Sequence, residues 1–371
     1  MTPVFRPATL PPGGRTLAAR WYLDAGVAQH ERERIFSRSW IAIGREEHFA
    51  EPGAYRLAEV AGESLIVVRG GDGILRALFN VCRHRGTRLC TEPAGVLGGS
   101  LQCPYHAWTY GLDGTLKVAR NMEGAPDFQR VNYPLKAAAV AEWEGFAFVN
   151  LAKRPEPLAS AFAPLLDRFA RWRLGALRVG RRIEYDVACN WKLVFQNYSE
   201  CYHCPVLHPQ LERFSPWDSG RNDLDEGPFL GGYSELRDRV ESLTADGRTK
   251  RAPLGDVRGD DLARIYYYTL FPTMLLSLHP DYAMAHYVRP LALDQTAIVC
   301  EWLFDARASA TPGFDPSDAV EFWDLTNRQD WRISELSQAG IASRAYEPGP
   351  YAPAEGLLHA FDRHYLSVME R

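Results

Sequence analysis

Two short segments each carry a cysteine and a histidine, and these residue types suit an iron–sulfur cluster. The first segment reads CRHRG over residues 82–86, and the second reads CPYHAW over residues 103–108. They offer the candidate ligands Cys82, His84, Cys103 and His106. Two thiolates and two neutral imidazoles fit a [2Fe–2S] cluster in which histidine replaces cysteine on one iron, which raises the reduction potential of the cluster. The segments therefore predict electron-transfer chemistry.

A structural zinc site is the alternative for these residues, because zinc also binds two cysteines and two histidines. Zinc fingers usually pair cysteine with cysteine and histidine with histidine, whereas each segment here is mixed. The surrounding residues also resemble the Rieske pattern. A glycine follows His84 by two residues, and the second segment runs on toward the turn GLDG at 111–114. We therefore expect a Rieske cluster.

A second candidate metal site lies in the segment NYSECYHCPVLH, residues 197–208. Its two histidines, His203 and His208, would point in different directions on one uninterrupted helix. We expect a helix from Trp191 to Cys204 that Pro205 ends, so that His208 can turn back toward His203. Two imidazoles and one distant carboxylate with open coordination positions form the ligand set of a non-haem Fe(II) site that binds O2.

The third ligand of this site must come from elsewhere, and Asp330 is our choice. It lies in NRQDW, residues 327–331, on a long helix expected over about 317–339. Asp324, six residues earlier and expected on a similar face of the same helix, is the competing candidate. A solvated helix carboxylate is the alternative reading for either aspartate. Cys201 and Cys204 could instead begin a zinc site, but no second cysteine pair follows them, so we expect them to be packing residues.

The composition excludes several classes of protein. With 371 residues, 46% hydrophobic and 24% charged, the chain is typical of a soluble protein with two domains. A net charge of -4, no apolar leader and no apolar run long enough to span a bilayer predict neither nucleic-acid nor membrane binding.

Seven cysteines, an odd number, do not resemble a secreted disulfide framework. We expect a cytoplasmic protein in which Cys90 is a free core residue.

The pattern of apolar runs and glycines divides the chain into three parts. Residues 1–45 are expected to form an N-terminal segment that packs on the catalytic domain, and residues 21–40 carry signals of a helix. Residues 46–150 read as short strands and hairpins, such as 64–79, that form a small all-β domain with the cluster ligands at loop tips. Residues 151–371 combine strand-like runs with long amphipathic helices, which predicts an α+β domain. Within it, residues 215–260 lack periodicity and look like a mobile surface loop.

Taken together, the chain resembles the α subunit of the Rieske non-haem iron ring-hydroxylating oxygenases through both main domains. The resemblance implies an α+β fold: an all-β Rieske domain plus a helix-grip (START-like) catalytic domain with an antiparallel sheet. It also implies a head-to-tail homotrimer in which electrons cross from the cluster of one subunit to the mononuclear iron of the next. In that family a carboxylate three residues before the first iron histidine bridges the two centres. Here that position is Glu200, where most aromatic-ring dioxygenases have aspartate.

Two further segments, ECYHC at 200–204 and SRAYEPGPY at 343–351, resemble the quaternary-ammonium branch of this family. Its members are glycine betaine, carnitine, choline and stachydrine monooxygenases. The resemblance implies hydroxylation and N-demethylation of a quaternary ammonium substrate, with O2 and with NAD(P)H electrons delivered by a separate flavin/iron–sulfur reductase. The alternative is hydroxylation or O-demethylation of an aromatic acid by the same mechanism. A pure electron-transfer protein would need only the Rieske domain, and a degenerate regulatory protein would not keep both ligand sets.

Aromatic side chains hold quaternary ammonium groups by cation–π attraction. The candidates in the catalytic half are Tyr266, Tyr267, Tyr268, Phe271, Tyr282, Tyr287 and Trp302. For any one of them, sheet core is the alternative. Strand alternation places Tyr266 and Tyr268 on one face and Tyr267 on the other, so at most some of them line a pocket. A substrate carboxylate would also need an arginine or lysine, which the sequence does not identify.

Overall fold

The computed structural model describes residues 3–370 and contains two compact units. One unit covers Arg32–Phe162, and the other joins the residues up to Glu31 with those from Ala163 onward. The sequence placed these boundaries at 45/46 and 150/151. Residues 32–45 group with the first unit because strand β1 (Ile41–Arg45) pairs with β10 (Phe146–Asn150). Among the described residues, no helix is both long and apolar enough to cross a membrane.

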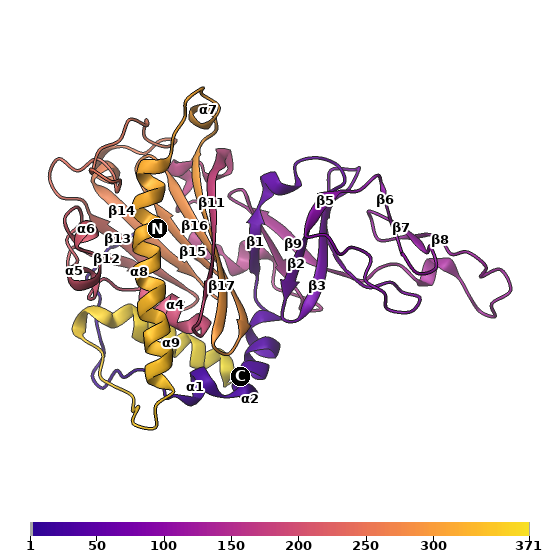
Figure 1. Cartoon of the computed structure of the whole chain (residues 1–371), viewed down its shortest axis with the longest axis horizontal. Coiled ribbons are helices and arrows are strands. Elements are labelled where there is room, and N and C mark those ends of the chain that lie inside the picture. Colours follow the sequence, from indigo (N-terminus) through magenta and orange to yellow (C-terminus); the bar gives the residue numbers. More distant parts are fainter. Residues whose placement is uncertain (1–2, 371) are drawn as a thin grey trace. The chain divides into compact units, whose positions relative to one another are not determined.

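The unit Arg32–Phe162 is built from antiparallel strands. A seven-stranded sheet has the order β1-β10-β9-β4-β3-β2-β5, and a three-stranded sheet has the order β6-β7-β8 (Figure 1). The remaining strands are β2 Ala54–Val60, β3 Glu63–Arg69, β4 Leu75–Phe79, β5 Ala94–Val96, β6 Ser100–Gln102, β7 Thr109–Gly111, β8 Leu116–Val118 and β9 Ala137–Trp143. The unit also contains helix α3 (Leu158–Ala161). The expected hairpin at 64–79 is confirmed as β3 and β4, joined by a turn in which Gly73 has a φ of 78°.

The second unit is an antiparallel sheet with helices packed on it. Its seven strands have the order β11-β17-β16-β15-β14-β13-β12. Their bounds are β11 Leu177–Val187, β12 Arg221–Leu224, β13 Phe229–Glu235, β14 Arg264–Leu270, β15 Met274–Leu278, β16 Ala283–Ala292 and β17 Gln295–Asp305. The helices are α1 Arg20–Leu23, α2 Ala25–Glu31, α4 Trp191–Tyr198, α5 Cys204–Leu207, α6 Pro209–Glu212, α7 Ala306–Ser309, α8 Ser317–Ile341 and α9 Gly356–Met369. Figure 1 shows the long helix α8 lying across one face of this sheet. The α+β expectation is confirmed.

The surface-loop prediction for residues 215–260 is wrong in part, because this stretch supplies β12 and β13. Strand β13 pairs with β14, and β12 forms the edge of the sheet. A glycine pair and the polar residues of the edge strand hide the apolar alternation that identifies a strand. A backbone bridge between Arg6 and Asn222 then adds the N-terminal segment to this edge, through N–H···O distances of 2.8 Å and 2.6 Å.

Helix α4 delivers the chain to the candidate iron site, and buried polar contacts fix its start. The Asn190 side chain caps it by accepting from the Lys192 backbone N–H. The Lys192 ammonium, fully buried, donates to Glu31 Oε1 at 2.6 Å, and the Tyr365 hydroxyl and the Trp191 indole N–H donate to the same carboxylate. A buried pair with this many hydrogen bonds holds the helix in one position, because removing one partner would leave a buried charge unpaired.

Candidate active site

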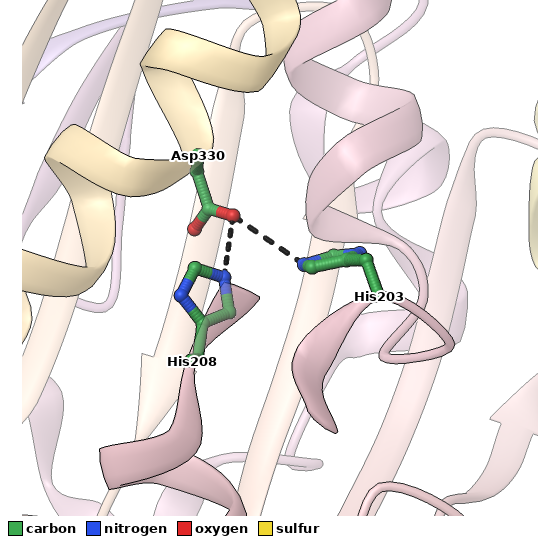
Figure 2. A group of neighbouring side chains, drawn as sticks. All are labelled: His203, His208 and Asp330. Carbon is green, nitrogen blue, oxygen red and sulfur yellow. Dashed lines mark hydrogen bonds and ion pairs between the residues drawn. The ribbon is translucent and has the colours of Figure 1, made fainter. Parts of the chain in front are cut away.

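Two histidines from one short segment meet an aspartate of helix α8, more than 120 residues further along the chain. Asp330 comes from the middle of α8, while His203 and His208 flank the short helix α5 (Figure 2). Asp330 Oδ1 lies 2.8 Å from His208 Nε2 and 3.4 Å from His203 Nε2. One nitrogen or oxygen from each residue falls within 4.8 Å of the others, which suits one shared metal ion.

The other carboxylate candidate, Asp324, lies elsewhere. The expectation that Asp324 shares a face with Asp330 is wrong, because six residues advance a helix by about one and two-thirds turns. Its carboxylate instead accepts from the Tyr185 hydroxyl at 2.7 Å and pairs with Arg328 at 2.9 Å. The structure therefore brings Asp330, and not Asp324, to the two histidines.

Both histidines are oriented by a hydrogen bond at Nδ1, which leaves Nε2 facing Asp330. His208 Nδ1 donates to Gln329 Oε1 at 2.8 Å, and Gln210 Nε2 donates to the same oxygen at 2.8 Å. His203 Nδ1 donates to Glu200 Oε1. Such bonds fix the tautomer and the ring orientation of a metal-ligating histidine. The arrangement thus presents two imidazole nitrogens and one carboxylate oxygen to a common point.

The same contacts set the charge of the site. Burial raises the pKa of Asp330, but its bonds with His203 and His208 outweigh burial and hold the pKa below its ordinary value. Burial lowers the pKa of His203, whereas the bonds to Asp330 and Glu200 raise it, with a net value of about 10. The Asn197 amide also donates to Asp330 Oδ1 at 3.1 Å. Asp330 is therefore ionised near neutral pH, as a carboxylate ligand of Fe(II) must be.

The local structure around His203 differs from the expected helix. Helix α4 ends at Tyr198, not at Cys204, and Pro205 sits in the first turn of α5 instead of ending α4. The Glu200 carboxylate accepts the backbone N–H groups of Tyr202 and His203, which competes with helical hydrogen bonding. The expectation that Cys201 and Cys204 are packing residues is wrong, because they form a disulfide with each other. His203 lies between them in the sequence.

The two cysteine–histidine segments form turns with matching backbone bonds. In the first, Cys82 N donates to Thr87 O at 2.9 Å and Gly86 N donates to Cys82 O at 3.0 Å. In the second, Cys103 N donates to the carbonyl of Trp108 at 2.8 Å, and the N–H of residue 107 donates back to Cys103 O at 3.1 Å. Gly86 in the first turn and Ala107 in the second both have a positive φ, 77° and 54° respectively. Each turn therefore holds its cysteine in the same backbone setting.

The burial of the four candidate ligands fits a cluster with one inner and one outer iron. Cys82 and Cys103 are buried in the core, while His84 and His106 are exposed, with ring centroids 4.7 Å apart. The Tyr110 hydroxyl lies 3.3 Å from Cys82 Sγ, where it can donate to a thiolate. Hydrogen bonds to cluster sulfurs are one of the means by which a protein sets the potential of an iron–sulfur cluster. The prediction that Cys90 is free and buried is confirmed.

A cavity of about 350 Å³ in the second unit meets the His203, His208 and Asp330 group. Its aromatic lining comprises Tyr198, Tyr202, Trp217, Tyr233, Tyr267 and Trp323, and residues 7 and 8 of the N-terminal segment form part of the wall. Tyr267 is the one member of the predicted aromatic set that lines the cavity within the described residues. Tyr266 and Tyr268 lie on the opposite face, as alternation predicted, and bond to Asp261 and Asp223. The other rings could not be predicted from the sequence, because they lie in separate segments that only the folded chain brings together.

Comparison with known proteins agrees with this geometry. A family model described as the catalytic domain of the ring hydroxylating alpha subunit matches residues 174–371, and a Rieske [2Fe-2S] domain model matches residues 39–131. The chain belongs to the Rieske ring-hydroxylating oxygenases. This oxygenase is therefore an oxidoreductase with a [2Fe–2S] cluster and a mononuclear iron, and it uses O2 and electrons supplied by a reductase.

Its relatives include two oxygenase subunits with curated names. The glycine betaine monooxygenase oxygenase subunit of Chromohalobacter salexigens is 32% identical, over 92% of this chain and 82% of the relative. The carnitine monooxygenase oxygenase subunit of Escherichia coli K12 is 29% identical, over 89% of this chain and 85% of the relative. The oxygenase also has the fold of a quaternary ammonium Rieske monooxygenase solved with L-carnitine (TM-score 0.79, 24% identity, 96% of each chain covered). Naphthalene 1,2-dioxygenase from Rhodococcus shares that fold (TM-score 0.78, 19% identity, 95% of this chain and 94% of that one).

Proposed function

We propose that this oxygenase oxidises a small quaternary ammonium compound at a carbon attached to the nitrogen. The observation that carries this proposal is the aromatic wall of the cavity that meets His203, His208 and Asp330. A quaternary nitrogen has no N–H to donate, and aromatic faces attract it without needing a hydrogen bond. The names of the glycine betaine and carnitine relatives support the same substrate class. Hydroxylation of an N-methyl group gives an unstable hemiaminal, which releases formaldehyde and leaves the N-demethylated amine.

We assign the metal centres to the residues that the geometry brings together. Cys82, Cys103 and the two exposed histidines of the same turns, His84 and His106, would hold the cluster, which supplies electrons. His203, His208 and Asp330 would hold the mononuclear iron, which supplies the site where O2 is reduced. A metal held by only these three ligands would keep positions for O2, and the cavity that the three residues line would give the substrate carbon room beside it. The protein's own part is to orient the ligands and the substrate.

Glu200 would serve as the bridge to a second subunit in a head-to-tail homotrimer. Its Oε1 already accepts from His203 Nδ1, which is one half of such a bridge. A carboxylate oxygen has a second lone pair that can accept from the exposed N–H of a cluster histidine on a neighbouring subunit. The electron donor would be a separate reductase that uses NAD(P)H and docks near the exposed Arg85 and Arg88 beside the cluster turns. We place the assembly in the cytoplasm.

A single-turnover experiment tests the substrate class without a matched reductase. The oxygenase, loaded with both iron centres and reduced with dithionite, is mixed with O2 and one compound from a panel of betaines, choline and aromatic acids. Formaldehyde formed in proportion to cluster oxidation with a quaternary amine supports the proposal. Hydroxylated product from an aromatic acid, with no formaldehyde from any quaternary amine, would replace it with the alternative reaction.

A further inference from the structure

We propose that Arg221 binds a carboxylate of the substrate, so that this oxygenase selects zwitterions with a quaternary nitrogen and an acid group. The inference rests on the proposed function and identifies the residue that distinguishes a betaine from an amino alcohol such as choline. Arg221 is the first residue of β12, the edge strand of the sheet, and lines the same cavity as the iron-site residues.

The charges of the cavity single out this residue. Among the described residues that line the cavity, Arg221 is the only lysine or arginine. Three carboxylates also line the cavity. Glu200 and Asp330 bond to the two histidines, and the third, Asp218, is exposed. Asp223, two residues further along the strand, forms an ion pair with Arg168 and accepts a hydrogen bond from the Tyr268 hydroxyl. No described carboxylate lies within 4.0 Å of the Arg221 guanidinium.

The hydrogen bonds of Arg221 leave one edge of its guanidinium available. Nη1 donates to the backbone carbonyl of Asp218 at 3.2 Å and to that of Gly220 at 2.7 Å. These two bonds use the two N–H groups of Nη1 and restrict how the side chain can move. Arginine has five N–H donors, so the Nε and Nη2 edge remains free of described protein partners. That edge has the spacing to bind both oxygens of a carboxylate.

The aromatic side of the cavity lies next to the iron ligands and complements this cation. Tyr198 and Tyr267 form an edge-to-face pair with ring centroids 6.1 Å apart, and Tyr267 and Trp323 form another at 6.3 Å. Tyr198 follows Asn197, whose amide donates to Asp330, so this ring cluster adjoins the metal ligands. A quaternary nitrogen held by these rings brings its methyl groups toward the iron. Its carboxylate then extends toward the edge strand and Arg221.

A substrate without a carboxylate would leave the Arg221 charge without its partner in a partly buried site. Sites built to hydrogen-bond a substrate group discriminate strongly against analogues that lack it. Because Arg221 is only half-buried, we expect discrimination on the order of 10- to 100-fold in KM, below the range for a fully enclosed site. The effect should fall on KM and not on kcat, because the carboxylate lies away from the reacting carbon.

The test compares Arg221→Gln, Arg221→Lys and the control Arg213→Gln against glycine betaine and its carboxamide analogue, which has no negative charge. Arg213 is exposed and does not line the cavity. Arg221→Gln should raise KM for glycine betaine 10- to 100-fold with kcat within about twofold, and should leave KM for the amide nearly unchanged. Arg221→Lys should retain part of the betaine preference because it keeps the charge but loses the bidentate edge. Arg213→Gln should behave as wild type.

The outcomes separate this inference from the function on which it rests. Equal losses for glycine betaine and the amide, or no loss for either, would overturn the role of Arg221 while the quaternary-ammonium function stands. A wild-type enzyme that oxidises no quaternary amine would overturn both. The melting temperature and the cluster spectrum of each variant show whether Arg221→Gln acts through misfolding. If it does, Arg221→Lys, which keeps the cation, decides the question by its betaine-to-amide ratio.

Discussion

Replacing Gln329 with leucine should weaken iron binding at the His203, His208 and Asp330 site while leaving helix α8 intact. Leucine and glutamine have similar helix propensities, so the helix itself should not be affected. The substitution removes the oxygen that accepts from His208 Nδ1 at 2.8 Å. His208 is only 1% exposed, so water cannot readily replace that acceptor. The ring would lose the bond that keeps its Nε2 aimed at the metal.

The expected magnitude follows from this single hydrogen bond. A buried donor left without a partner costs about 1–3 kcal/mol. Losing a partner of a metal-ligating histidine typically lowers metal affinity by about 10- to 100-fold. We therefore expect Gln329→Leu to bind iron about 10- to 100-fold more weakly. Gln329→Glu keeps an oxygen acceptor at the same place, so it should retain wild-type affinity or exceed it.

Iron retention against chelators of graded strength measures this effect. The visible spectrum of the cluster serves as an internal reference, because its ligands belong to the other unit of the chain. Arg328→Leu is the matched control, since Arg328 is the preceding residue on α8, with a side chain 62% exposed and an ion pair to Asp324. Wild-type iron affinity in Gln329→Leu, or an equal loss in Gln329→Glu and Arg328→Leu, would refute the reasoning.

Four other predictions concern the metal centres and the buried polar network. Cys103→Ser should abolish the visible spectrum of the cluster, whereas His208→Ala should keep that spectrum and lose the mononuclear iron and turnover, as absorption and iron counting will show. Glu200→Ala should retain both centres but slow oxidation of the reduced cluster in a single turnover, and an unchanged rate would remove Glu200 from the bridging role. Burial raises the pKa of Asp362 from 3.8 to about 7, so its folded state holds a proton more tightly than its unfolded state. Stability should therefore fall as pH rises from about 4 to 7, by up to about 4 kcal/mol from this group. Asp362→Asn should flatten that dependence in denaturant titrations at several pH values, and a slope unchanged from wild type would show that other groups cause it.

The sequence did best with the candidate cluster ligands, which stay a prediction, because each cysteine–histidine pair is local. In each cluster turn a cysteine and a histidine are at most three residues apart, so a single turn positions both. Strand alternation likewise assigned Tyr267 to a face opposite that of Tyr266 and Tyr268. The choice between Asp330 and Asp324 stayed open, because the helical period separates the faces of these two residues but does not say which face meets the histidines.

The walls of the cavity could not be predicted in the same way. Tyr198, Trp217 and Trp323 come from separate elements that only the folded chain brings together. The glycine pair at 231 and 232 looked like a loop signal, but a Cβ at either position would collide with the backbone of a neighbouring strand. These glycines allow strands β12, β13 and β14 to approach closely. Arg221 lay within the stretch taken for a loop, so its place in the cavity wall could not be predicted.

The pairing of Arg6 with Asn222 has a practical consequence for work with this enzyme. Residues 7 and 8 line the substrate cavity, and the strand beside them carries Arg221. A truncation that removes residues 7 and 8 would therefore remove part of the cavity wall, and a fusion joined directly to them would lie beside it. Kinetic constants measured on such preparations would report on the added or missing residues as well as on the enzyme. Comparisons of substrate preference between homologues should keep this segment native in every protein compared.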